Sequence, residues 1–242
     1  MSESLRVLSW NVHYPKFANN PNYAVEYFNN TKPDVICIQE YCNAKDDVVV
    51  QWFTDNGYIQ EYMPFAHNLD GFSQGVMTAV KKSLRPSSET VTLRDNGPRM
   101  FRNFPNIRGL IKTTVSIDGV DIDILNTHLT LARPYTMDMR KQEFEKLVET
   151  LDSLETESDN PMVLVGDFNF IPLDRRRKLL EKRYASFGGN TETKTWYWRG
   201  KKGFISANLD AVYWDSDKIH IDGELGELIG YDHRPLNLVA TL

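Results

Sequence analysis

The sequence predicts an α/β protein in which two packed sheets are flanked by helices. One observation is a pair of segments with period-two alternation around Asp118-Gly119, which is typical of a β-hairpin. Another is that further apolar runs of strand length are separated by segments with helical spacing. These elements do not form a plain series of strand-helix-strand units with a glycine-rich nucleotide turn. The mixture of hairpins and helices therefore favours two sheets packed face to face.

The first half of the chain alternates apolar strands with short helices. The expected elements are, in chain order, strand 5–12, helix 23–30, strand 34–39, helix 44–56 and strand 76–81. The second strand leads directly into Glu40, and Gly57 closes the second helix. Residues 85–109 are rich in proline and arginine, so we predict a basic loop there.

The second half begins with the hairpin and continues with strands and two helices. The expected elements are strands 110–117 and 120–125, a helix from about Thr136, strand 162–166, a basic helix over 173–183, and strands 209–214 and 236–240. Phe144, Leu147 and Leu151 fall on one face of the first of these helices. Residues 193–202, between the basic helix and strand 209–214, form a polar and aromatic stretch.

Length, composition and charge limit the possible functions. The 242 residues, 41% of them hydrophobic, are enough for a sizeable core, and no repeat or linker is visible. We therefore predict a single domain over residues 1–242. The formal net charge of −5 excludes a polycation that coats nucleic acid, so binding to a phosphate polymer needs a local basic patch or a metal ion.

The N-terminus has no apolar signal segment, and no apolar run approaches the roughly 20 residues of a membrane span. We expect a cytoplasmic protein with no transmembrane segment, and we infer no obligate protein partner. The two cysteines, Cys37 and Cys42, show no disulfide framework or zinc-site spacing, and Cys37 is expected to be a buried thiol.

Eight polar residues interrupt or end the apolar strands, where an unpaired polar side chain costs free energy. They are Asn11, Glu40, His128, Asp167, Asn169, Asp210, Asp232 and His233. A single residue of this kind is commonly a satisfied core or turn residue, and Asp167 and Asn169 alone are compatible with a turn. Eight acids, amides and imidazoles together are harder to explain by packing. We expect them to converge at one end of the sandwich.

The residue types in this group favour a hard cation. Glu40 is the best single candidate for a metal ligand, although a carboxylate at the start of a helix is the alternative. Oxygen ligands without a histidine-rich or cysteine-rich cluster select Mg²⁺ or Mn²⁺ over Zn²⁺. His128 and His233 are candidates for proton transfer or charge stabilisation, with Asp210 as the carboxylate partner of His233. The three remaining histidines, His13, His67 and His220, are expected to be mostly surface residues.

The strand ends also resemble the ordered motifs of the endonuclease/exonuclease/phosphatase superfamily. The matching fragments are Ser9-Trp10-Asn11-Val12, Ile38-Gln39-Glu40, Asn126-Thr127-His128-Leu129, Gly166-Asp167-Phe168-Asn169, Asn208-Leu209-Asp210 and Tyr231-Asp232-His233-Arg234-Pro235-Leu236. The resemblance spans residues 5–241, and six motifs in the right order make it specific. It implies a four-layer α/β/β/α sandwich of two mixed, mostly antiparallel sheets and metal-dependent cleavage of a phosphoester by water.

The resemblance also implies a role for each of the eight residues. Glu40 and Asn11 would hold Mg²⁺, and Asp232 would support the metal or a second metal position. Asp167 would orient or deprotonate the attacking water, and Asn169 would bind a phosphate oxygen. His128 would contact the phosphate or assist the leaving group, and His233, paired with Asp210, would be the second imidazole. His13 and Asn208 replace the acidic residue and the Arg that are usual in the apurinic endonucleases. The presence of His128 resembles the deoxyribonuclease, sphingomyelinase and deadenylase branches instead.

Three regions are candidates for substrate contacts. Trp196, Trp198 and Arg199 interleave aromatic rings with cations, which suits stacking on bases, although the rings can equally pack on the sandwich. Arg102 and Arg108 lie in the basic segment and form a candidate wall of the cleft. The helix over 173–183 is basic as well, but a charge run is usually a solvated face.

The leading hypothesis is an Mg²⁺-dependent nuclease acting on DNA or RNA, with Mn²⁺ as a possible substitute. The alternative is a phosphoesterase acting on a phospholipid head group or a small phosphate ester, for which residues 101–104 are the candidate apolar loop. A third hypothesis is a catalytically inactive scaffold that uses the cleft only for binding. The complete set of polar strand ends disfavours it.

Overall fold

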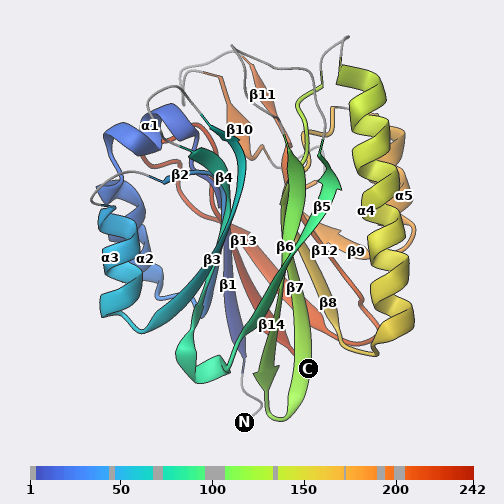
Figure 1. Cartoon of the computed structure of the whole chain (residues 1–242), viewed down its shortest axis with the longest axis horizontal. Helices are drawn as coiled ribbons and strands as arrows, with labels where there is room; N and C mark the ends of the chain where they lie inside the picture. The colour runs from blue at the N-terminus through green and yellow to red at the C-terminus, as the bar shows by residue number, and fades with distance from the viewer. Residues whose placement is uncertain are drawn as a thin grey trace.

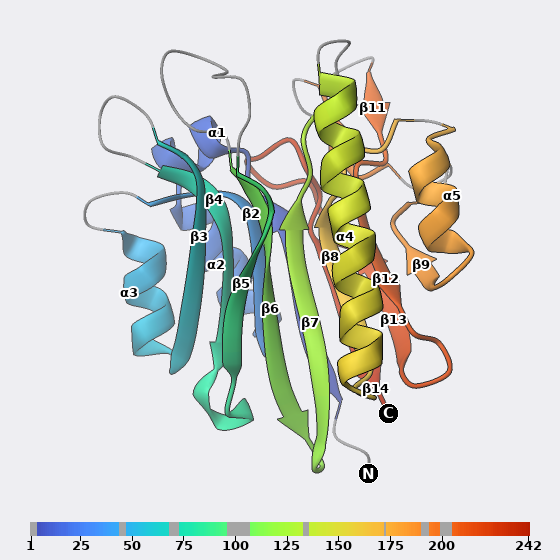
Figure 2. The same ribbon diagram turned by 45° about the vertical axis from the view of Figure 1, so that its right-hand side comes forward.

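Two sheets packed face to face, with helices outside each of them, make up the protein (Figure 1). A computed structural model describes residues 4–43, 47–67, 73–95, 107–132, 136–171, 173–189, 194–198 and 205–242. Helices α1 to α3 cover one outer face and helices α4 and α5 cover the other, as Figure 2 shows from a second side. The predicted α/β sandwich with four layers is therefore confirmed.

The first sheet has the strand order β13-β14-β1-β2-β4-β3. Its strands are β1 (Leu5–Asn11), β2 (Val35–Asn43), β3 (Tyr58–His67), β4 (Ser73–Lys81), β13 (His220–Leu225) and β14 (Leu236–Thr241). Strands β1 and β2 run parallel, while the other neighbouring pairs run antiparallel. The sheet is therefore mixed and mostly antiparallel, with its parallel pair in the interior.

The second sheet has the same plan, with the order β5-β6-β7-β8-β12-β9. Its strands are β5 (Ser87–Arg94), β6 (Arg108–Ile117), β7 (Val120–His128), β8 (Met162–Asp167), β9 (Ala185–Phe187) and β12 (Asp210–Trp214). Strands β7 and β8 are its parallel pair. A small ribbon of β10 (Trp196–Tyr197) and β11 (Ser206–Ala207) stands apart from both sheets.

The helices pack on the outer faces through their apolar sides. They are α1 (Tyr14–Asn19), α2 (Asn22–Thr31), α3 (Val48–Asp55), α4 (Met137–Glu157) and α5 (Arg175–Glu181), with a 3₁₀ turn η1 (Lys82–Leu84). Asp47 and Asp174 cap α3 and α5 because their carboxylates accept hydrogen bonds from amides of the first helical turn. No helix within the described ranges has both the length and the apolar character required to cross a bilayer.

Both faces of each sheet are covered, and the central strands are accordingly apolar in nearly every position. In β8, Val163 and Val165 pack between the sheets, whereas Leu164 faces α4. The predicted helical stripe is confirmed, because Phe144, Leu147 and Leu151 are buried against the second sheet.

Some elements differ from the expectation from the sequence. The segment 85–109 was predicted as a loop, but its first part forms β5, an edge strand whose first four residues are exposed. Helix α1 and strands β3, β9 and β13 were not predicted. β3, β9, β13 and β5 all lie at sheet edges, where one hydrogen-bonding side has no partner strand. Edge strands lack the continuous apolar run that identifies a buried strand.

The parallel pairs bring the functional strand ends together. Register places Asn11 beside Gln39 in the first sheet and His128 beside Asp167 in the second. Because β12 runs antiparallel to β8, it begins at this end, with Asp210 beside Asp167. This end of the sandwich lies opposite the two chain termini (Figure 1).

Candidate active site

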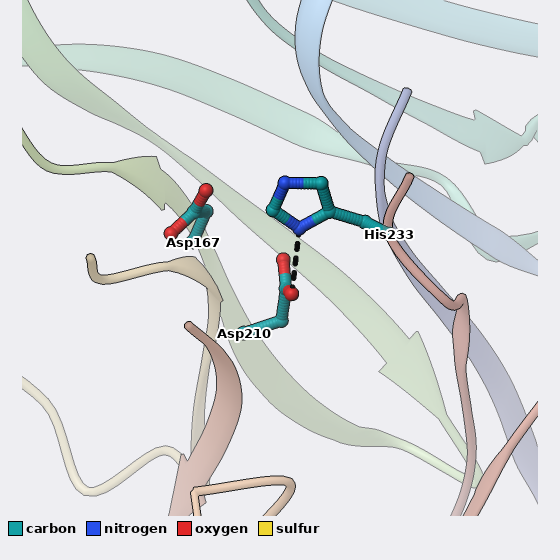
Figure 3. A group of neighbouring side chains, drawn as sticks. All are labelled: Asp167, Asp210 and His233. Carbon is teal, nitrogen blue, oxygen red and sulfur yellow. Dashed lines mark hydrogen bonds and ion pairs between the residues drawn. The ribbon is translucent and has the colours of Figure 1, made fainter. Parts of the chain in front are cut away.

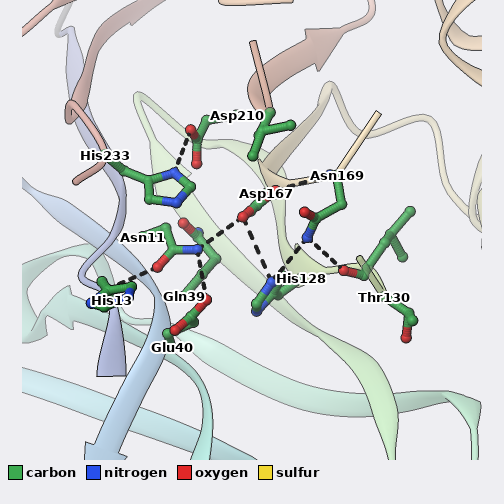
Figure 4. Close-up of polar contacts among 12 residues, drawn as sticks. Asn11, His13, Gln39, Glu40, His128, Thr130, Asp167, Asn169, Asp210 and His233 are labelled. Atoms are coloured by element: carbon green, nitrogen blue, oxygen red, sulfur yellow. Dashed lines mark hydrogen bonds and ion pairs between the residues drawn. The ribbon is translucent and has the colours of Figure 1, made fainter. Parts of the chain in front are cut away.

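The side chains at the polar strand ends meet across the two sheets at this end of the sandwich (Figure 4). Asn11 links three of the elements involved. Its Nδ2 donates to Asp167 Oδ2 at 2.8 Å and lies 3.3 Å from Glu40 Oε1. Its Oδ1 accepts from the backbone N–H of His13 at 2.9 Å, which fixes the orientation of the amide. One buried amide therefore connects an acid of the first sheet with an acid of the second.

Glu40 reaches this position because β2 bulges there. The register with β4 shifts between Gln39 and Tyr41, and Glu40 has a φ of 57°. A bulge re-aims one side chain without moving the rest of the strand. Glu40 Oε2 accepts a hydrogen bond from the backbone N–H of Tyr14 at 3.1 Å, and the residue is half-buried. Its carboxylate is therefore held in place but stays accessible.

Asp167 lies at the centre of the group and is 2% exposed. Burial raises the pKa of its carboxyl, and the nearby Asp210 raises it further, whereas His233 and the hydrogen bond from Asn11 lower it. The resulting pKa is about 7. The backbone N–H of Asn169 donates to Asp167 Oδ1 at 2.9 Å, which holds the turn after β8. Such a carboxyl can take up a proton near neutral pH.

His128 and Asn169 are in contact beside Asp167. Asn169 Nδ2 donates to the Leu129 carbonyl at 2.9 Å and lies 3.2 Å from His128 Nε2. Burial lowers the pKa of His128 well below its usual value, and Arg108 and His233 lower it further. His128 is therefore neutral at pH 7, and its Nε2 can act as an acceptor toward Asn169.

His233 has the opposite electrostatic environment (Figure 3). Its Nδ1 lies 2.8 Å from Asp210 Oδ2, and both side chains are buried. Burial alone lowers the pKa of His233, but the charge and hydrogen bond of Asp210, with Asp167 and Asp232, raise it to about 10. His233 is therefore an imidazolium at pH 7, the charge form opposite to that of His128. The predicted pairing of Asp210 with His233 is present.

Two further contacts hold the Asp210–His233 pair in place. Trp10 Nε1 donates to the His233 carbonyl at 3.0 Å. Thr195 Oγ1 accepts from the backbone N–H groups of Leu209 and Asp210 at 3.0 Å and 3.1 Å. The Asp–His pair is therefore supported by β1 and by the segment that leads into β10.

Two groups of donor atoms are available for a cation. Ligand atoms of Asp167, Asp210 and His233 lie within 4.8 Å of one another. In this group Nδ1 of the His233 imidazolium is already bonded to Asp210, and the ring itself supplies a positive charge. The oxygen atoms of the half-buried Glu40 carboxylate are of the type that Mg²⁺ prefers, whereas Asn11 points its Nδ2 toward Glu40 and its Oδ1 accepts from the backbone of His13. The chemistry of this carboxylate fits a hard divalent cation at Glu40.

Asp232 and His13 lie next to each other at the edge of the group. His13 Nε2 is 3.7 Å from Asp232 Oδ2, and the His13 side chain is 32% exposed. His13, expected to be mostly a surface residue, is partly exposed and has a carboxylate neighbour that was not predicted. His220 is exposed as expected. The side chain of His67 lies outside the described residues.

The candidate substrate residues are only partly described. Arg108 donates from Nε to Thr130 Oγ1 at 3.3 Å, and its guanidinium lies 5.0 Å from the centre of the Phe65 ring. Trp196 and Trp198 pack edge to face, with ring centres 6.1 Å apart, and Trp198 is 51% exposed. Arg102 and Arg199 lie outside the described residues.

A group of buried polar residues next to the strand ends was not predicted from the sequence. Gln39 and Asn126 bond to each other between the sheets, and Arg140 and Glu143 project from the inner face of α4. A signal for the last two was available, because they extend the stripe of Phe144, Leu147 and Leu151 and so place charged residues on an apolar helix face.

The fold and this cluster of acids, amides and histidines are typical of hydrolases that act on phosphoester bonds. The Endonuclease/Exonuclease/phosphatase family model matches residues 8–226, and the chain belongs to that family. Members of this family are hydrolases that act on phosphoester bonds. No curated protein sequence gives a significant match.

Several solved structures share the fold. The human Nocturnin catalytic domain with bound sulfate anion is similar with a TM-score of 0.78 and 17% identity, over 98% of this chain and 93% of that one. A truncated Caenorhabditis elegans TDP2 gives 0.71 and 19%, over 99% and 98% of the two chains. D. rerio TDP2 complexed with single strand DNA product gives 0.69 and 15%, over 99% and 100%.

Proposed function

We propose that the protein is a divalent-metal-dependent phosphodiesterase, and specifically a nuclease acting on DNA or RNA. The observation that carries the proposal is the meeting of Glu40, Asp167 and His233, from three distant parts of the chain, at one end of the sandwich. Asn11 bonds to the first two, and Asp210 bonds to the third. These five buried or half-buried polar groups are hydrogen-bonded to one another, yet such groups are often no more stabilising than apolar residues, so packing alone does not account for them.

In this proposal Glu40 and Asn11 hold Mg²⁺ or Mn²⁺, and Asp232 supports that ion or a second position. When bound, the ion supplies Lewis-acid stabilisation of charge on phosphate oxygens. Asp167 orients and deprotonates the attacking water, since its pKa of about 7 suits a general base near neutral pH.

The two histidines have different tasks because their charges differ. His233 is held as a cation by Asp210 and stabilises the negative charge that develops on the phosphorus-bound oxygens. His128 is neutral and contacts the phosphate or the leaving group together with Asn169. Environments that drive two like residues to opposite protonation states are typical of catalytic sites.

A polynucleotide substrate is supported by the aromatic residues beside His233. Trp196 forms a β-bridge with His233, and the two rings are 6.5 Å apart between centres. The exposed Trp198 continues this aromatic surface outward, which suits stacking of a base next to the scissile phosphate. Arg108 supplies a cation close to Thr130 and His128. A DNA-bound neighbour of the same fold adds to this argument.

A second candidate, hydrolysis of a phospholipid head group, is favoured by one observation. Leu173 is 86% exposed and Ile171 is 47% exposed, shortly after Asn169 in the chain. Exposed apolar side chains next to a phosphate site can enter a lipid interface. The predicted apolar loop at residues 101–104 lies outside the described residues.

A panel of substrates tests the proposal. Plasmid, single-stranded DNA, abasic duplex, poly(A), sphingomyelin and inositol phosphates are incubated with Mg²⁺ or with EDTA. We expect cleavage of a polynucleotide in Mg²⁺, none in EDTA, and none by Glu40→Gln. Glu26→Gln, an exposed glutamate on α2, is the matched control and should cleave like the wild type.

Three results would contradict the proposal. Full activity of Glu40→Gln would remove Glu40 from the site. Hydrolysis of sphingomyelin without cleavage of any polynucleotide, with loss of activity in Leu173→Ser, would replace the nuclease by the lipid enzyme. Binding of an oligonucleotide that is indifferent to salt would count equally against a nucleic-acid substrate.

A further inference from the structure

Helix α4 carries two charged residues on the face that packs against the second sheet. Arg140 is 2% exposed and Glu143 is 0% exposed, although their neighbours on this face are Phe144 and Leu147. Burying an ionised side chain costs several kcal/mol, and apolar residues of similar volume are often at least as stabilising. Packing alone therefore does not explain why this face contains charges.

Glu143 holds the loop that follows β7. Its Oε2 accepts from the backbone N–H of Thr130 at 2.9 Å, and its Oε1 accepts from Thr130 Oγ1 at 2.7 Å. Arg94 Nε donates to the same Oε1 at 2.7 Å and compensates the buried charge. Thr130 is two residues after His128, so Glu143 fixes the segment from which the His128 imidazole projects.

Arg140 holds the loop that follows β8. Its Nη2 donates to the Asn169 carbonyl at 2.8 Å and to Asp174 Oδ2 at 3.3 Å. Asn169 has a φ of 50°, a left-handed conformation that costs free energy for a residue with a side chain. A guanidinium bonded to its carbonyl stabilises that conformation, and with it the direction of the Asn169 amide toward His128.

The two contacts together join both loops to one rigid element. Arg140 and Glu143 are three residues apart on α4, so they lie on neighbouring positions of the same face. The loops that they hold meet where Asn169 Nδ2 bonds to the Leu129 carbonyl and contacts His128. A shift of either loop would change the Asn169–His128 contact beside Asp167.

We propose that Arg140 and Glu143 are positioning residues that set the relative geometry of His128 and Asn169 from outside the site. This inference rests on the proposed function for its effect on catalysis. In the proposed mechanism neither side chain touches the reacting atoms. Both therefore act on kcat, through the placement of His128 and Asn169. Misplacement of a catalytic group by about 1 Å costs on the order of 10²-fold in rate.

The first test compares variants of α4 on the polynucleotide that the wild type cleaves. Arg140→Met should lower kcat on the order of 10-fold or more with little change in KM, and Arg140→Lys should recover part of the loss because Nζ can still donate to the Asn169 carbonyl. The variant should fold, since Arg176 still compensates Asp174 at 2.6 Å. Lys141→Met, at an exposed position of the same helix, is the control and should leave kcat unchanged.

Glu143→Gln gives a second, independent variant. It keeps one acceptor oxygen where the carboxylate offers two to Thr130, and it loses the charge that pairs with Arg94, so we expect a smaller kcat and an unchanged KM. Glu145→Gln, exposed on the same helix, is its control. Combining Arg140→Met with Asn169→Ala should cost no more in kcat than Asn169→Ala alone, because Arg140 acts through Asn169.

An activity-independent measurement separates this inference from the proposed function. Amide hydrogen exchange of Thr130 should accelerate in Glu143→Gln, and that of Asn169 in Arg140→Met, while the central strands keep wild-type protection. If the wild type cleaves no substrate, the proposed function fails and the exchange data still decide the positioning role. Unchanged exchange at Thr130 and Asn169, or an unchanged kcat in folded Arg140→Met, would overturn the inference.

Discussion

The side-chain hydrogen bonds of Asn126 to Gln39 and to the Met77 carbonyl join the two sheets next to the candidate site. Gln39 Nε2 donates to Asn126 Oδ1 at 2.8 Å, and Asn126 Nδ2 donates to the Met77 carbonyl at 2.8 Å. Both side chains are fully buried. Gln39 precedes Glu40, and Asn126 lies two residues before His128, so this contact fixes the position of β2, which carries Glu40, relative to β7, which carries His128.

Asn126→Ala should therefore reduce stability strongly. The Asn126 side chain makes four buried hydrogen bonds, and loss of the two shortest, at 2.8 Å, costs about 1 kcal/mol each. Truncating the buried side chain adds about 1 kcal/mol more. We expect the free energy of unfolding to fall by about 3 kcal/mol, measured by urea denaturation with an unchanged m-value. Asn30→Ala, at an exposed position of α2, is the control and should change stability by less than about 0.5 kcal/mol.

A double-mutant cycle distinguishes the hydrogen bond from simple loss of packing. Gln39→Met combined with Asn126→Leu removes both polar partners while keeping their volume. The double variant should be more stable than the sum of the two single losses predicts, by about 1–2 kcal/mol. Single losses that simply add, or a loss below about 0.5 kcal/mol for Asn126→Ala, would refute the reasoning.

Three further predictions concern the backbone, a buried thiol and catalysis. Gly166→Ala should destabilise by about 3 kcal/mol or more in urea denaturation, because the new Cβ would lie 1.9 Å from the Thr127 carbonyl oxygen; near-native stability would contradict the close strand contact. Burial raises the pKa of the Cys37 thiol from 9.0 to about 12, so its contribution to the free energy of unfolding is complete below pH 9 and declines as the pH rises toward 12. The free energy of unfolding of Cys37→Ala should therefore fall less than that of the wild type between pH 9 and pH 12. The same pH dependence in both proteins would refute this. His233→Ala should lower kcat on the order of 10²-fold in a polynucleotide cleavage assay, and a loss of only a few-fold would make His233 structural.

The buried strands and the residues at their ends were predictable from the sequence because they break an otherwise uniform pattern. Asp167 ends the apolar run of β8, and it is buried like the rest of the strand. Once the strand is identified, the position of the Asp167 side chain at its end follows. The hairpin turn was equally clear. Asp118 and Gly119 have φ values of 51° and 82°, the conformations that this pair of residue types favours.

What was missed depends on contacts between distant segments. Nothing local in the sequence shows that Glu40 takes a left-handed conformation at a bulge, since that follows from pairing with β4. His13 looked like an isolated surface histidine because the turn of α1 that brings it to Asp232 is short and polar. Strand β5 was hidden by its exposed polar residues, which only the ladder with β6 orders as a strand.

The most direct measurement for the central claim is the position of a bound metal ion. Crystals soaked in MnCl₂ and measured at a wavelength where Mn²⁺ scatters anomalously would locate the ion without assumptions about the substrate. We predict a peak about 2.1 Å from a carboxylate oxygen of Glu40, the usual distance for Mg²⁺-type sites, and its loss in Glu40→Gln. A peak at a distant surface, with none at Glu40, would contradict the account.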